Sequence, residues 1–213
     1  MKSLEANTKM LATEIKIQKA FIKLINLSGF DKLTIQKLCQ EAHISRGTFY
    51  LHYIDKYDLL NHYEDEIVAN ISEIFKRFQK PQLNSAIQNG DKENNAFFQL
   101  FKYLYRQRDL AALLLNGNTT KIVAKVKRLI EEVLVEPQTS QSTITTQIPA
   151  AFAKEIVSQG IIDLITFWLN QNPILPPREA YQIFQQSRSL TPQQLTQIIF
   201  KEAPQGDRNE KTV

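Results

Sequence analysis

Hydrophobic residues recur at intervals of three and four along most of the chain, which is the spacing of an amphipathic helix. The first stripe runs from about Thr8 to Ser28 and stops before Gly29, a residue that accepts the left-handed conformation in which many helices end. A second long stripe begins near Lys56 and is stopped by Pro81. No segment alternates with a period of two, so the pattern predicts an all-α fold.

The remainder of the chain contains several shorter apolar stretches with helical spacing, separated by polar segments. They predict helices over residues 96–105, 109–115, 120–135, 150–170, 178–187 and 191–201. Residues 79–95 and the Thr-, Ser- and Gln-rich residues 136–149 are predicted loops. We therefore expect a small head over residues 1–55, a connecting helix over 56–80, a larger helical domain over 81–203 and a tail over 204–213.

Within the head, residues 33–53 have the pattern of two short helices joined by a tight turn. Thr34 and Ser45 each stand where a hydroxyl can cap the first turn of a helix. His43 falls at the turn, where the backbone must take positive φ, a conformation that histidine tolerates better than most residues. Ile44 can then pack against Phe49 and fix the direction in which the second helix begins.

The opposite face of the second short helix carries Arg46, Gly47, Thr48, Tyr50, Leu51 and His52. A guanidinium, hydroxyls, an imidazole and a bare backbone suit a helix that enters the major groove of DNA. A purely structural interpretation exists for some of these positions, because a capping residue would be needed without DNA and Tyr50 could serve as a packing aromatic. The sequence predicts a helix-turn-helix whose second helix recognises DNA.

Residues 48–60, Thr-Phe-Tyr-Leu-His-Tyr-Ile-Asp-Lys-Tyr-Asp-Leu-Leu, follow Ile44-Ser-Arg-Gly, and together they resemble the DNA-binding signature of tetracycline-repressor-type (TetR family) transcriptional regulators. The resemblance extends over residues 15–60. It implies base contacts from Gln36, Arg46 and Gly47, and phosphate contacts from the remaining positions of the motif. The full set of expected DNA-binding residues is Thr34, Gln36, Ser45, Arg46, Gly47, Thr48, Tyr50, His52 and Lys56.

Charge and composition agree with this interpretation without proving it. Residues 1–60 contain nine Lys or Arg and six Asp or Glu, so they account for +3 of the formal charge of +4. A basic head favours phosphate binding. One cysteine, Cys39, excludes an internal disulfide, no apolar run is long enough to span a bilayer, and the first residues lack the apolar region of a signal peptide. We expect a cytoplasmic protein that makes no contact with a membrane.

Catalysis has no support in the sequence. The three histidines, His43, His52 and His62, lie in the head or at the start of the connecting helix, and none is spaced from Cys39 as metal ligands are. Residues 64–66, Glu-Asp-Glu, are adjacent on a predicted helix and are interpreted as a solvated face. The chain has no glycine-rich phosphate loop and no nucleophile elbow. We predict no catalytic residue, no metal site and no cofactor.

The larger helical domain suggests two uses. The family resemblance, which includes a similarity of residues 160–170 to a Gram-positive branch, implies that the last long helices form a homodimer interface through Ile161, Ile165, Trp168, Tyr181 and Phe184. An aromatic-rich segment could line a pocket for a small apolar or amphipathic effector, with Phe97, Phe98, Phe101, Tyr105 and Phe152 as its walls. At helical spacing, the same aromatic residues could equally be core.

These observations predict a homodimeric regulator of transcription that binds double-stranded DNA at a palindromic operator. We expect repression, relieved when an effector tilts the long connecting helix. One alternative is a DNA-bound activator or co-regulator whose C-terminal domain binds another protein. A more distant alternative is a helical small-molecule-binding protein or enzyme in which the helix-turn-helix serves only for packing.

Overall fold

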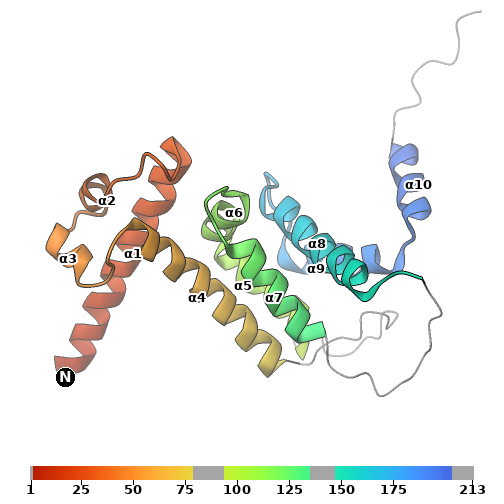
Figure 1. The fold of residues 1–213 in the computed structure, drawn as a ribbon, viewed down its shortest axis with the longest axis horizontal. Coiled ribbons are helices and arrows are strands. Elements are labelled where there is room, and N and C mark those ends of the chain that lie inside the picture. Colours follow the sequence, from red (N-terminus) through yellow and green to blue (C-terminus); the bar gives the residue numbers. More distant parts are fainter. Residues whose placement is uncertain (1, 79–93, 135–146, 203–213) are drawn as a thin grey trace, which may run out of the picture.

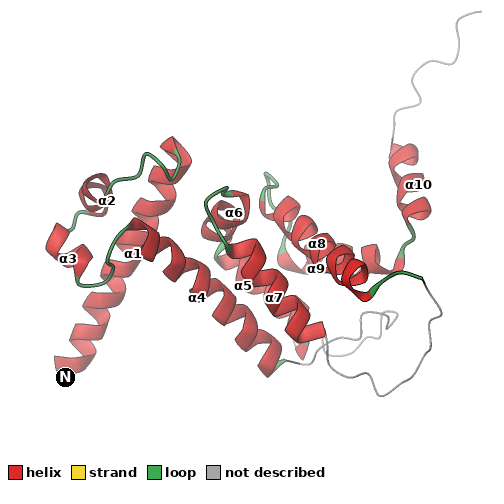
Figure 2. Cartoon of the chain, viewed as in Figure 1, coloured by secondary structure: helices red, strands yellow, loops and turns green. Residues whose placement is uncertain are grey.

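The computed structural model describes residues 2–78, 94–134 and 147–202, and within these ranges the chain is built from ten helices and no strand (Figure 1, Figure 2). This confirms the all-α prediction. The helices are α1 (Lys2–Ser28), α2 (Ile35–Ala42), α3 (Arg46–Tyr50), α4 (Lys56–Arg77), α5 (Ala96–Arg106), α6 (Arg108–Asn116), α7 (Ile122–Leu134), α8 (Ala150–Leu169), α9 (Pro177–Ser189) and α10 (Pro192–Glu202). The predicted loops and tail lie largely outside the described residues.

Helices α1, α2 and α3 form the head. Helix α1 begins earlier than the predicted Thr8 and ends before Gly29, whose φ of 79° confirms the expected left-handed termination. The rings of Phe21 and Phe49 and the side chain of Leu38 have no exposed surface, and they form the centre of this small core. Leu24 of α1 is only half-buried, at the edge of this core.

Helix α4 connects the head to the rest of the molecule, running diagonally between them (Figure 1). Asp55 caps it, accepting hydrogen bonds from the backbone N–H groups of Tyr57 and Asp58 at 2.8 Å. The first turns of α4 belong to the head core, because the Tyr63 ring packs edge-on against Phe21 at 5.1 Å. The helix ends at Arg77, before the proline that the sequence suggested as its stop.

Helices α5 to α9 form the body. Helix α5 lies between α4 and α9, α7 packs against α4 and α8, and α6 contacts α1 of the head as well as α8. Arg108 at the start of α6 donates hydrogen bonds to the backbone carbonyl oxygens of Leu169 (3.1 Å) and Gln171 (2.7 Å). A guanidinium at the C-terminus of a helix satisfies orphan carbonyls and favours the helix dipole. It fixes the end of α8 next to the head.

Helix α10 extends away from the body after α9 (Figure 1). Thr191 and Gln194 form a reciprocal cap at its start, in which the Thr191 N–H donates to Gln194 Oε1 at 2.8 Å and the Gln194 N–H donates to Thr191 Oγ1 at 3.3 Å. Thr191 therefore caps α10. Among the helices of the described ranges, none is both long enough and apolar enough to cross a lipid bilayer.

Candidate DNA interface and effector cavity

The helix-turn-helix has the local geometry that its sequence predicted. Thr34 Oγ1 accepts a hydrogen bond from the Lys37 N–H at 3.2 Å, and Ser45 Oγ accepts one from the Thr48 N–H at 2.9 Å. His43 occupies the left-handed region at φ 53° and ψ 48°. Its N–H donates to the Gln40 carbonyl oxygen at 3.2 Å. These contacts fix both ends of α2 and the start of α3 without help from DNA.

Gln36 of α2 and Arg46 of α3 meet on the exposed side of the motif. Arg46 Nη2 donates a hydrogen bond to Gln36 Oε1 at 2.9 Å, and both residues are exposed. This contact engages one of the five N–H groups of the guanidinium. The pair therefore orients Arg46 and leaves most of its donors for an external acceptor such as a guanine edge.

Gly47 follows Arg46, and the fold itself gives no reason for a glycine there. A Cβ atom built at this position would meet only Ser45 Oγ, at 3.6 Å, which is an ordinary contact, and the backbone does not take positive φ. The missing side chain leaves the backbone of α3 open to something outside the chain. A DNA groove approached closely is such a partner.

Beyond α3, a group of apolar and aromatic side chains is exposed in the same region. Tyr50 is 56% exposed, Leu51 85% and Ile54 80%, and Tyr57 at the start of α4 is 54% exposed. The sequence placed Tyr50 and Leu51 on the outward face of this helix, and it predicted a DNA contact for Tyr50 only. The position of Ile54 outside the apolar stripe could have identified this residue as well, since apolar side chains in a groove can contact thymine methyl groups.

Two of the predicted phosphate-binding residues are engaged inside the head. The His52 side chain is only 15% exposed, and its Nδ1 lies 3.9 Å from a carboxylate oxygen of Glu14 on α1. Lys56 Nζ lies close to three backbone carbonyl oxygens of the α1–α2 loop, those of Phe30 (3.1 Å), Asp31 (3.2 Å) and Leu33 (3.1 Å).

An ammonium has three N–H groups, so these contacts engage all the donors of Lys56. The same Nζ lies 4.8 Å from the centroid of the Phe30 ring and 5.4 Å from that of Tyr57, within the range of cation–π attraction. A phosphate contact from Lys56 would have to replace one of these interactions. The phosphate contact remains a prediction. The contacts of Lys56 with the three carbonyl oxygens and the two rings also give it a structural role.

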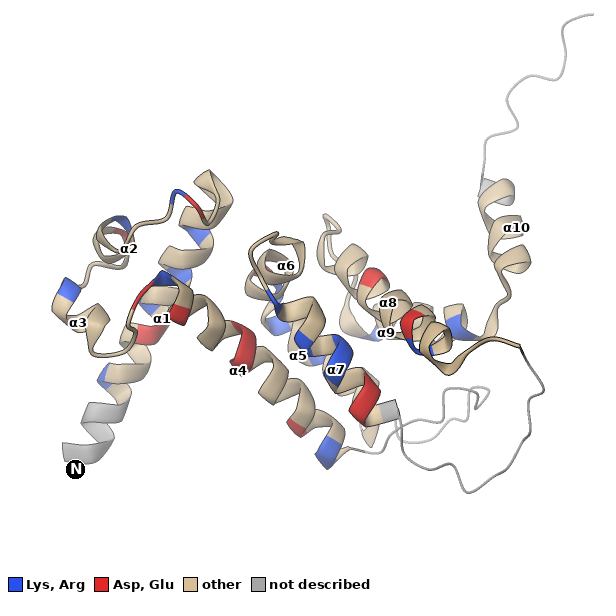
Figure 3. Cartoon of the chain, viewed as in Figure 1, with Lys and Arg blue, Asp and Glu red and all other residues tan. Residues whose placement is uncertain are grey.

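Lysine and arginine are distributed over every helix of the head, with acidic residues interleaved (Figure 3). The positive side chains include Lys37 on α2 and Arg46 on α3, both exposed. Burial raises the pKa of Cys39, which lies behind Arg46, and the nearby guanidinium opposes that shift. Cys39 is 4% exposed and therefore belongs to the core of the head.

The body contains an apolar cavity of about 60 Å³ between α4, α5, α6, α7 and α8. Its walls are entirely hydrophobic: Ile67, Ile71, Phe75, Phe97, Leu100, Leu104, Ala111, Leu115, Ile122, Val126, Leu129, Ile130, Val133, Ile161, Ile162 and Ile165. Such a space stays dry in the absence of a ligand, because a water molecule there would find no polar partner.

Of the five predicted pocket residues, Phe97 lines this cavity. Phe98 and Phe101 are buried elsewhere, where their rings pack against α9. Tyr105 is 40% exposed and stacks on the Trp168 ring, and Phe152 is 65% exposed. The aliphatic walls supplied by α4 and α7 were not selected from the sequence, although their spacing along both helices was visible there.

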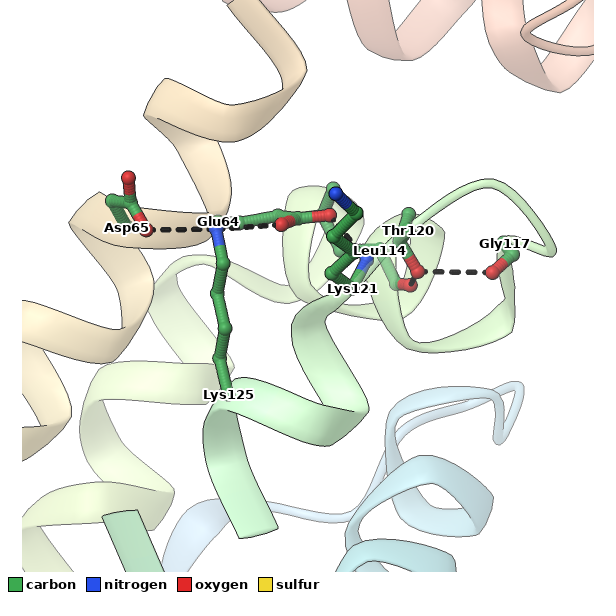
Figure 4. Close-up of polar contacts among 7 residues, drawn as sticks. All are labelled: Glu64, Asp65, Leu114, Gly117, Thr120, Lys121 and Lys125. Carbon is green, nitrogen blue, oxygen red and sulfur yellow. Dashed lines mark hydrogen bonds and ion pairs between the residues drawn. The ribbon is translucent and has the colours of Figure 1, made fainter. Parts of the chain in front are cut away.

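A buried carboxylate connects α4 with α7 (Figure 4). Glu64 is 1% exposed, whereas the sequence interpretation placed it on a solvated face. Its Oε1 accepts a hydrogen bond from the Lys121 N–H at 2.7 Å, and its Oε2 lies 2.8 Å from Lys125 Nζ. Lys125 also contacts the exposed Asp65 at 2.7 Å. Burial alone would lower the pKa of Lys125, but the two carboxylates raise it above its ordinary value.

Models of known protein families match both the head and the body of this chain. Residues 17–63 match the family model described as bacterial regulatory proteins, tetR family. Residues 91–189 match the model described as transcriptional regulator C-terminal region. The chain belongs to the TetR family. It is a DNA-binding transcriptional regulator and not an enzyme.

Solved structures of TetR-family proteins share the fold at low sequence identity. A TetR transcriptional regulator from Streptococcus agalactiae has 21% identity and a TM-score of 0.56, covering 87% of this chain and 98% of its own. FadR from Bacillus subtilis, solved with stearoyl-CoA, has 17% identity and a TM-score of 0.55, covering 82% and 96%. NalD, the secondary repressor of the MexAB-OprM efflux pump in Pseudomonas aeruginosa, has 17% identity and a TM-score of 0.53, covering 81% and 90%. Among curated proteins, none matches the sequence.

In this TetR-family chain, the residues expected at a dimer interface lie inside the subunit. Ile161, Ile165, Trp168, Tyr181 and Phe184 are each at most 7% exposed, because they pack towards α5 and the cavity. They have almost no surface left for a second subunit. The exposed apolar side chains of the same two helices are different ones: Phe152 (65%), Ile156 (64%) and Phe167 (70%) on α8 and Ile183 (48%) on α9.

Proposed function

We propose that this regulator is a homodimeric repressor that binds a palindromic operator and is released when a small apolar or amphipathic molecule enters the body. One observation carries the proposal: the first turns of α4 belong to the head core, and later turns of the same helix form a wall of the cavity. A ligand that moves this wall would therefore move the head. Release would be a population shift, since the ligand must bind the non-binding arrangement more tightly.

On the DNA side, Arg46 and Gln36 act as a pair at the base edges, and Gly47 lets the backbone approach the groove floor. Arg46 can bind the two acceptors of a guanine, which is the commonest specific contact in major grooves. Thr34, Ser45, Thr48 and Tyr50 contact phosphates around this pair. His52 and Lys56, which are engaged by contacts within the head, support these residues from behind. Two such heads, related by a two-fold axis, would contact successive major grooves.

The proposed subunit interface is the exposed apolar face of α8 and α9. Its members Phe152, Ile156, Phe167 and Ile183 recur along the outer side of the two helices. A monomer would leave these side chains in water, while a two-fold arrangement of the four helices would bury them. Phe167→Asp should place a carboxylate in this interface and give a monomer by sedimentation velocity, whereas Glu179→Gln, on an exposed polar position of α9, should not.

The proposed ligand has an apolar part, because the cavity walls contain no polar side chain. At about 60 Å³ the cavity must widen to accept more than a small group, and widening is what would displace α4. A related fold, FadR from Bacillus subtilis, was solved with stearoyl-CoA, and NalD is a repressor, which supports a ligand-responsive repressor without naming this ligand. A fatty acyl chain is the first class to test.

The experiment is binding of the purified protein to fragments of the DNA that flanks its own gene, titrated at several salt concentrations. Competitor-resistant binding to a two-fold-symmetric sequence is the expected result. Specific contacts should persist at salt concentrations that remove non-specific binding. If no fragment were bound specifically at any salt concentration, and a random library of palindromes also failed, the proposal of operator binding would be refuted.

A further inference from the structure

The buried carboxylate of Glu64 is the least expected polar group in the body. Taking a carboxylate out of water costs several kcal/mol unless charges and hydrogen bonds compensate. Here Oε1 accepts a hydrogen bond from the backbone N–H of Lys121, and Oε2, which has no hydrogen-bond partner, is compensated by its ion pair with the ammonium of Lys125. Lys121 directly precedes α7, and its N–H is one of the orphan donors of that helix. Glu64 of α4 therefore caps α7 and pairs with its first turn.

The same two helices continue past this contact as walls of the cavity. Helix α4 contributes Ile67, Ile71 and Phe75, and α7 contributes Ile122, Val126, Leu129, Ile130 and Val133. The two helices run side by side in the same direction, so the polar contact joins them at the end nearer the head (Figure 1, Figure 4). Beyond it, apolar packing alone joins α4 to α7 among the described residues that line the cavity.

The α7 end of the contact is itself fixed in the turn after α6. Thr120 Oγ1 lies 2.7 Å from the Leu114 carbonyl oxygen and 2.9 Å from that of Gly117, and it donates to them. The turn has no room for a side chain at Gly117, where a Cβ atom would lie 2.9 Å from Thr120 Cγ2 and 3.2 Å from the Leu113 carbonyl oxygen. The turn that leads to Lys121, the hydrogen-bond donor to Glu64, is therefore rigid, and α6, which precedes this turn, packs against α1 of the head.

We infer that Glu64 and Lys125 form the pivot about which α4 turns when the cavity is filled, so that these two residues position the head for DNA binding. The inference rests on the proposed release mechanism and identifies the point about which α4 rotates. At about 1.5 Å per residue, Phe75 lies about 16 Å from Glu64 along α4, and Lys56 lies about 12 Å away in the other direction. If α4 turns about Glu64 as a rigid rod, its start at Lys56 moves in the direction opposite to Phe75 and about three quarters as far.

The test replaces the unidentified ligand with a side chain that fills the cavity. Ala111→Leu adds an isopropyl group to the cavity wall and should spread α4 from α7. Operator affinity is measured for six proteins: the unchanged chain, Glu64→Gln and Asp65→Asn, each with and without Ala111→Leu. Glu64→Gln keeps the acceptor for the Lys121 N–H and removes the ion pair. Asp65→Asn is the matched control, because it removes the exposed partner of Lys125 and leaves Glu64 in place.

With the pivot intact, Ala111→Leu should lower operator affinity about tenfold, a usual size for coupling between sites. In the Glu64→Gln background the same substitution should change affinity by about twofold or less, the limit of additive behaviour. The Asp65→Asn background should keep the tenfold effect. Lys125→Met provides a second disruption of the pair if Glu64→Gln unfolds, and Ala111→Val a smaller filling residue if Ala111→Leu does.

Two results would overturn the inference, and they are distinguishable. If filling the cavity weakened operator binding equally with and without Glu64, the cavity would be coupled to the head but the pivot would lie elsewhere. If filling the cavity had no effect in the unchanged chain, the proposed release mechanism would fail as well. Melting curves of all variants separate either result from simple unfolding. A variant that is only destabilised would have a lower melting midpoint, but the ratio of operator affinities with and without Ala111→Leu would not change.

Discussion

Lys56→Met should destabilise the protein and leave the salt dependence of DNA binding almost unchanged. The ammonium donates to three carbonyl oxygens at 3.1–3.2 Å, which closes the loop between α1 and α2 onto the start of α4. Hydrogen bonds to a charged group are worth about 1.5–3 kcal/mol each in buried settings. Methionine keeps the apolar stem and removes every donor.

Because Lys56 is partly exposed and water can reach the released carbonyls, we take about 2–3 kcal/mol for the whole set, well below the sum of three separate bonds. For a chain of this size, each kcal/mol lowers the midpoint of thermal unfolding by about 2–4 °C. The expected decrease is therefore about 4–12 °C. Lys37→Met is the control, since this exposed lysine of α2 has no such contacts and should change the midpoint little.

The assay combines thermal unfolding followed by circular dichroism with operator binding at several salt concentrations. A lysine that contacts a phosphate contributes about 0.9 to the slope of log affinity against log salt for each phosphate. A variant that kept its melting midpoint but lost this contribution would refute the reasoning and show that Lys56 acts on DNA directly. A lower melting midpoint together with a smaller salt slope would indicate that Lys56 both stabilises the fold and contacts a phosphate.

Three further predictions concern the head and the buried tyrosines. Arg46→Ala should lower operator affinity by about 1–3 kcal/mol and relax specificity at one base pair of each half-site, measured by competition with base-substituted operators, while Gln36→Ala should have a smaller effect. Gly47→Ala should leave the melting midpoint unchanged or raise it slightly, because the fold has room for a Cβ, yet weaken operator binding. Burial raises the pKa values of Tyr53 and Tyr181 to about 12. The contribution of these two tyrosines to the free energy of unfolding is therefore fully present below pH 10 and is lost as the pH rises towards 12. Their tyrosinate absorbance should appear together with unfolding.

The head was predictable from sequence because its structure depends on neighbouring residues. A cap such as Thr34 or Ser45 acts on an N–H three positions away, and the left-handed turn at His43 follows from its place between two short helices. The order of helices was also predictable, since each apolar stripe is a local property. The DNA-facing side of α3 followed once Phe49 was assigned to the core.

The body was predictable in its elements and not in its faces. Helix α5 has a clear apolar face, but this face packs against both α4 and α9, so the sequence does not show which of its aromatic rings reach the cavity. Helix α8 is apolar almost all around, so no stripe indicates which side is buried. For this reason Phe98 and Phe152 were placed in the cavity, and Trp168 was placed at the subunit surface. Glu64 could not be distinguished from its acidic neighbours, because its burial depends on α7, which is far away in sequence.

The overlap between the head core and α4 determines how this protein could be divided. The rings of Phe21 and Tyr63 are in contact, so a fragment that stopped at residue 55 would lose part of its own hydrophobic centre. An independently folding DNA-binding fragment must include at least about two turns of α4, and the tetR family match likewise extends to residue 63. Chimeric regulators that combine this head with another sensor should therefore be joined within α4, beyond Tyr63, and they will inherit the direction in which the new helix leaves the head.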